Sequence, residues 1–230
     1  MYNRLLAYAV HLFTILGVYV SFLAIEAAVE KNISLVFLYL AIALLIDGID
    51  GSLARWADVK TFAPKINGEI LDNIIDYLNY VVVPVFIFYT LNMVPEPFLL
   101  LSSAAILLVS CFTFINTETK TEDFYFSGFP ANWNIVILYF YILDSTQWIN
   151  LFFVLLFCVL TFIPFKYVHP FRVVEFRKIT LLITSIWMVT TTVLLFGITF
   201  TNPLIGTLNY VIWLLTNAYF LGNVFYRSTK

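Results

Sequence analysis

Charged side chains are scarce in this sequence. Asp, Glu, Lys and Arg make up 11% of its 230 residues, whereas 62% are hydrophobic and the mean hydropathy is +0.93. Soluble domains carry about 25% charged residues, so this composition excludes a water-facing globular protein and a disordered chain. A net charge of -2 leaves no polybasic surface, which excludes a nucleic acid as a partner. The sequence therefore predicts an integral membrane protein whose partners include membrane lipids.

Cysteine is also rare. The chain has two, Cys111 and Cys158, and both lie in apolar runs. Their number and separation exclude a disulfide framework and a cysteine-based metal site, so we expect both to be packing residues. The apolar stretch from Leu5 to Val29 is too long for a cleaved signal peptide and has no Ala-x-Ala exit. We expect this stretch to be a retained first span.

Long apolar runs make up most of the chain. A transmembrane helix needs about 20 mainly apolar residues, because no water is present in the hydrocarbon layer to satisfy an open backbone. We therefore expect an all-α, polytopic helical bundle that forms a single membrane domain over residues 1–230. The eight expected transmembrane helices are residues 6–28, 34–56, 68–91, 97–116, 129–143, 147–165, 176–198 and 204–226.

The basic residues fall unevenly between these spans. With the amino terminus inside, eleven of the twelve Lys and Arg residues lie in inner segments, and Lys31 is the exception. Basic residues accumulate on the cytoplasmic side of membrane proteins. We therefore expect both termini in the cytoplasm, together with the loops 56–67, 117–128 and 166–175.

Four aspartates fall near the facing ends of the second and third expected spans. An ionised carboxylate within a membrane span costs about 2.5 to 3.5 kcal/mol on insertion scales. We therefore expect each of the four to have a function or a partner that offsets this cost. Asp47 and Asp50 are three residues apart, and Asp72 and Asp76 are four apart, so each pair projects from one helix face. Because one span runs inward and the next returns, we expect all four carboxylates to meet near the cytoplasmic ends. Oxygen ligands without Cys or His select hard ions, which predicts a Mg²⁺ or Mn²⁺ site.

Basic neighbours offer a second interpretation of the same carboxylates, as helix-interface ion pairs. The basic residues able to form them are Arg55, Lys60 and Lys65. The glycines favour the metal site, because Gly48, Gly51 and Gly68 are poor helix formers that let a ligand approach the backbone. Small Ala54 beside Arg55 likewise allows a nucleotide to lie against the helix while its phosphate meets a guanidinium.

The residues from Asp47 to Asp76 follow the pattern D-x2-D-G-x2-A-R-x12-G-x3-D-x3-D. This pattern resembles the signature of the CDP-alcohol phosphatidyltransferase family at all eight fixed positions. The twelve-residue spacer between Arg55 and Gly68 is longer than in most of the family. With Gly48 after the first aspartate, it resembles the bacterial phosphatidylcholine synthase branch, whose acceptor is free choline. Three further stretches resemble that branch, residues 10–14, 120–134 and 168–173.

The resemblance implies an enzyme that moves the phosphatidyl group of CDP-diacylglycerol to an alcohol and releases CMP, and we expect one direct displacement. It implies that Mn²⁺ or Mg²⁺ is bound by Asp47, Asp50, Asp72 and Asp76, and that Asp76 also acts as the catalytic general base. The nucleotide-binding residues that it implies are Asp47, Gly51, Ala54, Arg55 and Gly68. It further implies a multi-pass enzyme of the bacterial inner membrane and a homodimer, and the expected topology places the active site toward the cytoplasm.

Choline carries a fixed positive charge, which aromatic faces bind at about 0.5 to 2 kcal/mol for each contact. The expected choline-binding residues are Tyr77, Tyr80, Phe129 and Trp133, with Glu122 or Asp123 as a counter-charge. Other residues expected to contact substrate are His11, Thr14, Lys120, Asn134 and Arg172. Ordinary alternatives remain open for these side chains, because aromatic residues also form interfacial belts and basic residues mark the cytoplasmic side.

Two alternatives to choline transfer remain open. Another member of the same family would use serine, inositol or a glycerol derivative, although a phosphorylated acceptor needs a dense basic pocket and few basic residues are available. A cation transporter would use the carboxylates as a pathway. Transport is disfavoured because the four aspartates are expected at one face of the membrane and no charged residue continues the path outward.

Overall fold

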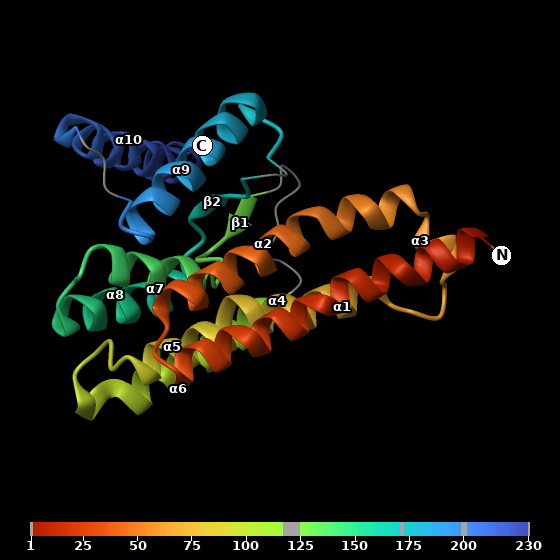
Figure 1. Ribbon diagram of the computed structural model, residues 1–230, viewed down its shortest axis with the longest axis horizontal. Coiled ribbons are helices and arrows are strands. Elements are labelled where there is room, and N and C mark those ends of the chain that lie inside the picture. The colour runs from red at the N-terminus through yellow and green to blue at the C-terminus, as the bar shows by residue number, and fades with distance from the viewer. Residues whose placement is uncertain (1, 117–124, 171–172, 199–201, 230) are drawn as a thin grey trace. The chain divides into compact units, whose positions relative to one another are not determined.

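The computed structural model describes residues 2–116, 125–170, 173–198 and 202–229. These residues are mainly helical, with two strands of three residues each, which confirms the all-α expectation (Figure 1). In chain order the elements are α1 (Tyr2–Val29), α2 (Ile33–Trp56), α3 (Val59–Phe62), α4 (Gly68–Tyr77), the π-helix η1 (Leu78–Val82), α5 (Val83–Thr90), α6 (Glu96–Ile115), β1 (Tyr125–Ser127), α7 (Trp133–Ile142), α8 (Gln147–Leu160), β2 (Lys166–Val168), α9 (Arg177–Leu195) and α10 (Pro203–Ser228).

The chain folds into two compact units. Unit 1 consists of Met1–Phe114 and Ala131–Phe152, and unit 2 consists of Ile115–Pro130 and Phe153–Lys230. Apart from the last residue of α6, unit 1 holds α1 to α7 and the first part of α8, whereas unit 2 holds both strands, α9 and α10. The single domain expected over residues 1–230 stays a prediction.

Each of the eight expected spans contains a helix. By length and composition, six of the described helical stretches are able to cross a membrane, namely Tyr2–Val29, Ile33–Trp56, Gly68–Thr90, Glu96–Ile115, Arg177–Leu195 and Pro203–Ser228. Helices α7 and α8 are shorter, with 10 and 14 residues. The expected bounds 129–143 and 147–165 are thus too wide, because a proline at position 130 precedes α7 and the chain turns after Leu160 toward β2.

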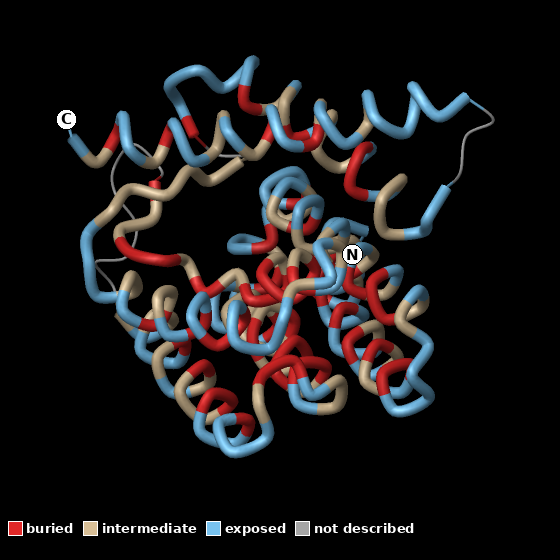
Figure 2. Tube along the Cα trace, turned by 90° about the vertical axis from the view of Figure 1, so that its left-hand side faces the viewer, coloured by how far each residue is buried: buried red, intermediate tan, exposed pale blue. Residues whose placement is uncertain are grey.

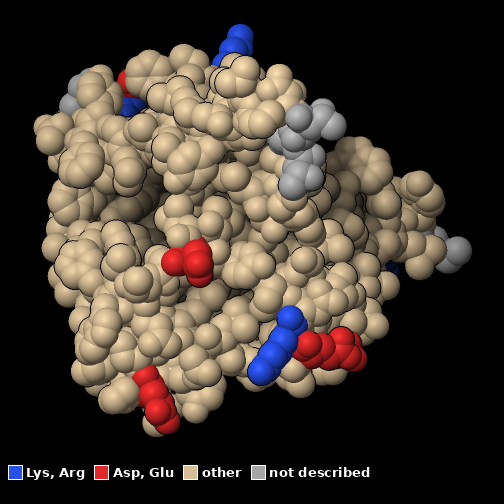
Figure 3. Space-filling model, turned by 60° about the vertical axis from the view of Figure 1, so that its left-hand side comes forward, with Lys and Arg blue, Asp and Glu red and all other residues tan. Residues whose placement is uncertain are grey.

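Large apolar side chains cover the outer faces of the long helices. Leu12 on α1, Leu100 on α6 and Leu204 on α10 are 61%, 73% and 74% exposed. Few charged side chains interrupt the face of the molecule that Figure 3 shows. Soluble proteins rarely expose apolar surface of this extent, so these faces are suited to lipid. Together with the six helices of spanning length, they identify a multi-pass membrane protein.

A row of small side chains on α1 contributes to the core of unit 1. Ala7, Thr14 and Ser21 recur every seven residues and are buried, and the buried positions of the unit 1 helices face one another in Figure 2. An added Cβ atom at Gly17 would lie 3.0 Å from Ile75 Cγ2, so α1 and α4 approach closely because that position has no side chain. Small residues permit such close helix packing in membranes.

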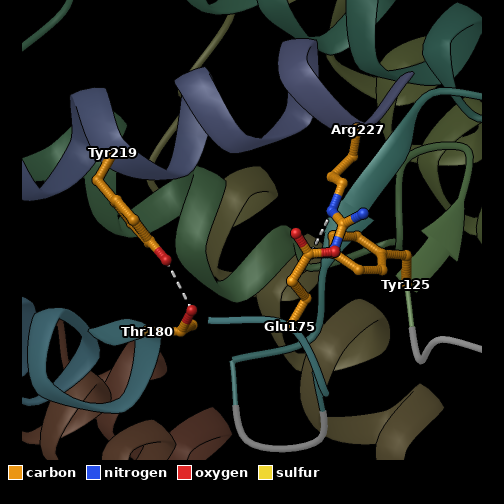
Figure 4. A network of polar contacts seen from close by, with 5 residues as sticks. All are labelled: Tyr125, Glu175, Thr180, Tyr219 and Arg227. Carbon is orange, nitrogen blue, oxygen red and sulfur yellow. Dashed lines mark hydrogen bonds and ion pairs between the residues drawn. The ribbon is translucent and has the colours of Figure 1, made fainter. Parts of the chain in front are cut away.

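Unit 2 contains a short sheet and an ion pair between a buried arginine and an exposed glutamate. Strands β1 and β2 are antiparallel. Arg227 on α10 forms an ion pair with Glu175, and its Nε donates to the Tyr125 hydroxyl at 3.0 Å (Figure 4). The hydroxyl groups of Thr180 and Tyr219 lie 2.7 Å apart and link α9 to α10. These polar contacts involve none of the aspartates of the motif.

Candidate metal and nucleotide site

Helix α4 begins at Gly68 because Asn67 caps it. The Asn67 side-chain oxygen accepts hydrogen bonds from two backbone N–H groups of the first helical turn, each at 3.1 Å. An N-cap residue satisfies donors that have no partner within the helix. This start fixes Asp72 and Asp76 on one face of the first half of the third span, about one turn apart.

The aspartates of α2 and α4 come together in unit 1. Asp47, Asp50 and Asp72 each offer a carboxylate oxygen, and these oxygens all lie within 4.8 Å of one another. The carboxyl group of Asp76 interacts with those of Asp47, Asp72 and Asp50. Asp50 is buried and the other three are half-buried. We call these four residues the acidic cluster.

The acidic cluster needs a positive group or a proton within it. The oxygens of Asp47, Asp50 and Asp72 lie within 4.8 Å of one another, and ionised carboxylates at this separation repel each other unless a positive group or a proton compensates them. Within the described residues, no salt bridge joins the cluster to the three basic neighbours Arg55, Lys60 and Lys65. Arg55 is exposed, and its Nη2 donates to Ser52 Oγ at 3.0 Å instead. This geometry favours a bound cation over the ion-pair interpretation.

Two residues of α1 border the acidic cluster. The Thr14 hydroxyl donates to the Val10 carbonyl at 3.3 Å and interacts with the Asp50 carboxyl group. An added Cβ atom at Gly68 would lie 3.3 Å from His11 Cε1, so the His11 ring packs against the first residue of α4. His11 is only 4% exposed, and its Nε2 atom has no hydrogen-bond partner among the described residues. Buried polar atoms are normally paired, so this nitrogen is available to a ligand.

The hydroxyl groups of Tyr77 and Tyr80 are both bonded within unit 1. The Tyr77 hydroxyl donates to the backbone carbonyl of Leu107 on α6 at 2.9 Å. The Tyr80 hydroxyl donates to Asp47 Oδ2 at 2.5 Å. Neither contact was part of the expectation that these rings bind choline. Tyr80 thus belongs to the surroundings of the acidic cluster.

The remaining aromatic candidates are buried. Trp133 is 1% exposed and donates from Nε1 to Ser110 Oγ at 2.8 Å in unit 1. Phe129 lies in unit 2, where it stacks on Phe157 with 4.7 Å between ring centroids. Asn134 is also buried, and its side-chain oxygen accepts a neighbouring backbone N–H at 2.9 Å. Four further candidates lie outside the described residues, namely Lys120, Glu122, Asp123 and Arg172.

The sequence matches one protein family over most of its length. The sequence model of one family matches residues 4–216, and that family is described as CDP-alcohol phosphatidyltransferase. The chain belongs to the CDP-alcohol phosphatidyltransferase family. The match extends over most of the chain and includes residues of both units, so the family relationship is not confined to the aspartate motif.

Similar members of the CDP-alcohol phosphatidyltransferase family share one name. The chain is 40% identical to the phosphatidylcholine synthase of Pseudomonas aeruginosa over 228 residues, which are 99% of this chain and 94% of that protein. It is 41% identical to the phosphatidylcholine synthase of Borreliella burgdorferi over 184 residues, covering 80% of this chain and 79% of that protein. It is 39% identical to the corresponding enzyme of Mesorhizobium japonicum over 181 residues, covering 79% and 68%.

CDP-alcohol phosphatidyltransferases generally use divalent metal ions. The acidic cluster has the donor chemistry for such an ion, because its three grouped carboxylates offer oxygen atoms and the group contains no Cys or His. Sequence reasoning identified these aspartates from their spacing, but it missed the bond between Tyr80 and Asp47. The signal for that bond was present, since the four-residue spacing of Asp72 and Asp76 continues to Tyr80.

Proposed function

We propose that this chain is a phosphatidylcholine synthase, which transfers the phosphatidyl group of CDP-diacylglycerol to choline and releases CMP. The observation that carries the reaction is the grouping of Asp47, Asp50 and Asp72, whose oxygens lie within 4.8 Å of one another. The choice of acceptor is supported by relatives of 39% to 41% identity that are named for this product.

We assign the acidic cluster, Asp47, Asp50, Asp72 and Asp76, to the binding of Mn²⁺ or Mg²⁺. When bound, the ion neutralises charge that develops on the diphosphate and makes CMP a better leaving group. The protein's part is to hold the carboxylates on two helices rather than on loops, which keeps their positions precise. The Asn67 cap contributes by fixing where α4 starts.

Asp76 is assigned as the general base for choline. Its carboxylate accepts the proton of the choline hydroxyl while the choline oxygen forms a bond to the lipid-side phosphorus. The bond from that phosphorus to the bridging oxygen breaks, and its electron pair leaves with CMP. General base catalysis contributes about 10² to 10⁴-fold. One direct displacement balances the reaction, so no covalent enzyme intermediate is needed.

The nucleotide is assigned to the start of α4 and the end of α2. The residues with this role are Asp47, Gly51, Ala54, Arg55 and Gly68. Small side chains at Gly51 and Ala54 let a nucleotide lie against α2, and the exposed Arg55 guanidinium can bind a phosphate through two parallel hydrogen bonds. An added Cβ atom at Gly48, on the same helix, meets nothing within 4 Å, so the protein leaves space there.

His11 and Thr14 complete the nucleotide assignment from α1. The Nε2 atom of His11 is buried and unpaired among the described residues, and the ring touches the Gly68 position. We assign this nitrogen to a polar atom of the cytidine moiety, because leaving it unpaired in the complex would cost about 1 to 3 kcal/mol. Thr14 supports the same region through Asp50.

We place the choline next to Asp76, because its hydroxyl must reach that carboxylate. The quaternary ammonium group cannot donate a hydrogen bond, so aromatic faces or a carboxylate must compensate its charge. The residues expected from the sequence stay predictions for this role, namely Tyr77, Tyr80, Phe129 and Trp133 with Glu122 or Asp123. The same holds for the substrate contacts expected at Lys120, Asn134 and Arg172.

We infer that the enzyme lies in the bacterial inner membrane with the acidic cluster toward the cytoplasm. The support is the distribution of Lys and Arg, of which eleven of twelve fall in the inner segments. The six long helices give an even number of crossings. Helices α7 and α8 add two crossings if both span the membrane and none if neither does, so the number stays even in both cases. A homodimer stays a prediction that rests on the family resemblance alone.

The test is a choline-incorporation assay with purified protein. We expect labelled choline to enter lipid only when CDP-diacylglycerol and Mn²⁺ or Mg²⁺ are both present, and a chelator to abolish the product. Serine, inositol and glycerol 3-phosphate are assayed in parallel at equal concentration. Transfer to one of these in place of choline contradicts the proposed acceptor. Choline uptake into vesicles without incorporation into lipid would indicate transport instead.

A further inference from the structure

A π-helix interrupts the third span directly after the last aspartate. Residues Leu78–Val82 form η1, between α4 and α5. The backbone N–H of Val83 donates to the carbonyl of Leu78, five residues earlier. Single π turns within α-helices occur frequently at functional sites. This turn contains Tyr80, whose hydroxyl contacts the acidic cluster.

The wide turn explains how Tyr80 reaches the cluster. Asp72, Asp76 and Tyr80 are each four residues apart. A regular α-helix has 3.6 residues per turn, so a residue four positions further along lies slightly past one full turn. Two such steps would move the side chain of Tyr80 away from the face that carries Asp72. A π turn holds more residues than an α turn, so it reduces this rotation. Tyr80 therefore stays close to the face of the two aspartates.

Neighbouring contacts hold the π turn in this register. Asn79 is buried, and its side-chain oxygen accepts a hydrogen bond from the Ser21 hydroxyl on α1. Val81 and Val83, which both follow Tyr80 in the chain, are fully buried. The turn is thus fixed by packing and by a hydrogen bond to another helix. A side chain carried by such a turn has a defined direction.

The Tyr80 hydroxyl donates to one oxygen of Asp47, at 2.5 Å from Oδ2. A donor on one carboxylate oxygen restrains the rotation of the carboxylate and leaves the other oxygen available to a metal ion. Partners that orient metal ligands in this way contribute about 10 to 100-fold to metal affinity or activity. We propose that Tyr80 is a positioning residue that orients Asp47 for divalent-cation binding. The proposal rests on the metal site assigned under the proposed function.

The test separates the Tyr80 hydroxyl from its ring. Tyr80→Phe removes the donor and keeps the aromatic face. We expect the Kd for Mn²⁺, measured without substrates from the electron paramagnetic resonance signal of free Mn²⁺, to rise by about 10-fold or more. The matched control is Tyr89→Phe, on α5 of the same span, where the side chain is 49% exposed. The control should bind Mn²⁺ as the wild type does.

A second pair of variants identifies the partner of Tyr80. In an Asp50→Asn background, Tyr80→Phe should weaken Mn²⁺ binding further. In an Asp47→Ala background it should have no further effect, because the acceptor is gone. Equal Mn²⁺ affinity of Tyr80→Phe and wild type, with both proteins monodisperse in detergent, overturns the proposal. An equal further loss in both backgrounds overturns it as well.

Kinetics distinguish this role from choline binding. At saturating Mn²⁺, Tyr80→Phe should keep the choline KM of the wild type, because the ring face is unchanged. A raised choline KM with unchanged Mn²⁺ affinity would instead place Tyr80 in the choline pocket and refute the positioning role. Mn²⁺ binding requires no substrate, so the proposal is measurable even when choline proves to be the wrong acceptor.

Discussion

Asp72 and Asp76 have the same side chain on the same helix face, but their surroundings differ. Asp72 belongs to the group of three carboxylates whose oxygens lie within 4.8 Å, together with Asp47 and Asp50. Asp76 lies outside that group and contacts it through Asp47. A metal ligand must remain with the ion, whereas a general base must also meet the acceptor hydroxyl. This difference supports giving the role of general base to Asp76, in addition to metal binding, rather than to Asp72.

We expect Asp76→Asn to lower kcat by at least about 100-fold, because the amide cannot accept the choline proton. The Kd for CMP should change by only a few-fold, whereas the Kd for Mn²⁺ should rise because Asp76 is also assigned to the metal site. Asp72→Asn should weaken Mn²⁺ binding as well as turnover. Single-turnover kinetics and Mn²⁺ titration measure the two effects. Full activity in Asp76→Asn would show that another group takes the proton.

We expect His11→Ala to raise the Kd for CMP by about tenfold, which corresponds to one hydrogen bond of about 1.4 kcal/mol. Isothermal titration calorimetry with CMP measures this change directly. The control is His169→Ala, which alters the other histidine of the chain. His169 lies in unit 2 and stacks on Phe126 with 5.3 Å between ring centroids. Unchanged CMP affinity in His11→Ala would remove His11 from the nucleotide site.

Helix α1 contributes to the site through close packing. Gly17 lets α1 approach Ile75 on α4. Helix α1 also places His11 beside Gly68, the first residue of α4, and Thr14 beside Asp50 of the acidic cluster. Displacing α1 by a fraction of an ångström therefore alters both the packing and the site. The close approach depends on a missing side chain, so it is sensitive to a single methyl group.

We expect Gly17→Ala to destabilise the protein by about 1 to 3 kcal/mol, because the new Cβ atom lies 3.0 Å from Ile75 Cγ2. Thermal unfolding in detergent should show a lower midpoint. Gly206→Ala, on α10, is the matched control, since an added Cβ atom there meets nothing within 4 Å. If the two variants unfold at the same temperature, α4 accommodates the methyl group without cost.

Local signals explain which helices and site residues were predictable. Long apolar runs gave a helix in every expected span, and the spacing of Asp47 with Asp50 placed both on one face of α2. The start of α7 and the end of α8 were missed because turns in the flanking chain, rather than hydropathy, determine them. The π turn around Tyr80 and the bond from Trp133 to Ser110 were missed for another reason. Both depend on contacts between segments far apart in the sequence, namely Asn79 with Ser21 and Trp133 with Ser110.

The distribution of basic residues predicts one orientation for the complete chain in the membrane. A green fluorescent protein fused after Lys230 should fluoresce, because the carboxyl terminus is expected in the cytoplasm. Alkaline phosphatase inserted after Lys31 should be active, because the first turn is expected on the outer side. The reverse pattern of the two reporters would place the acidic cluster on the outer side and contradict our assignment.

All of the metal and nucleotide residues that we assign lie between His11 and Asp76, within the first three spans. Proteins emerge from the ribosome amino-terminal part first. These three helices therefore enter the bilayer before α9 and α10 have been synthesised. The carboxylates of α2 and α4 repel each other when they are ionised, so we expect a divalent ion to help these two helices pair during insertion as well as in the finished enzyme.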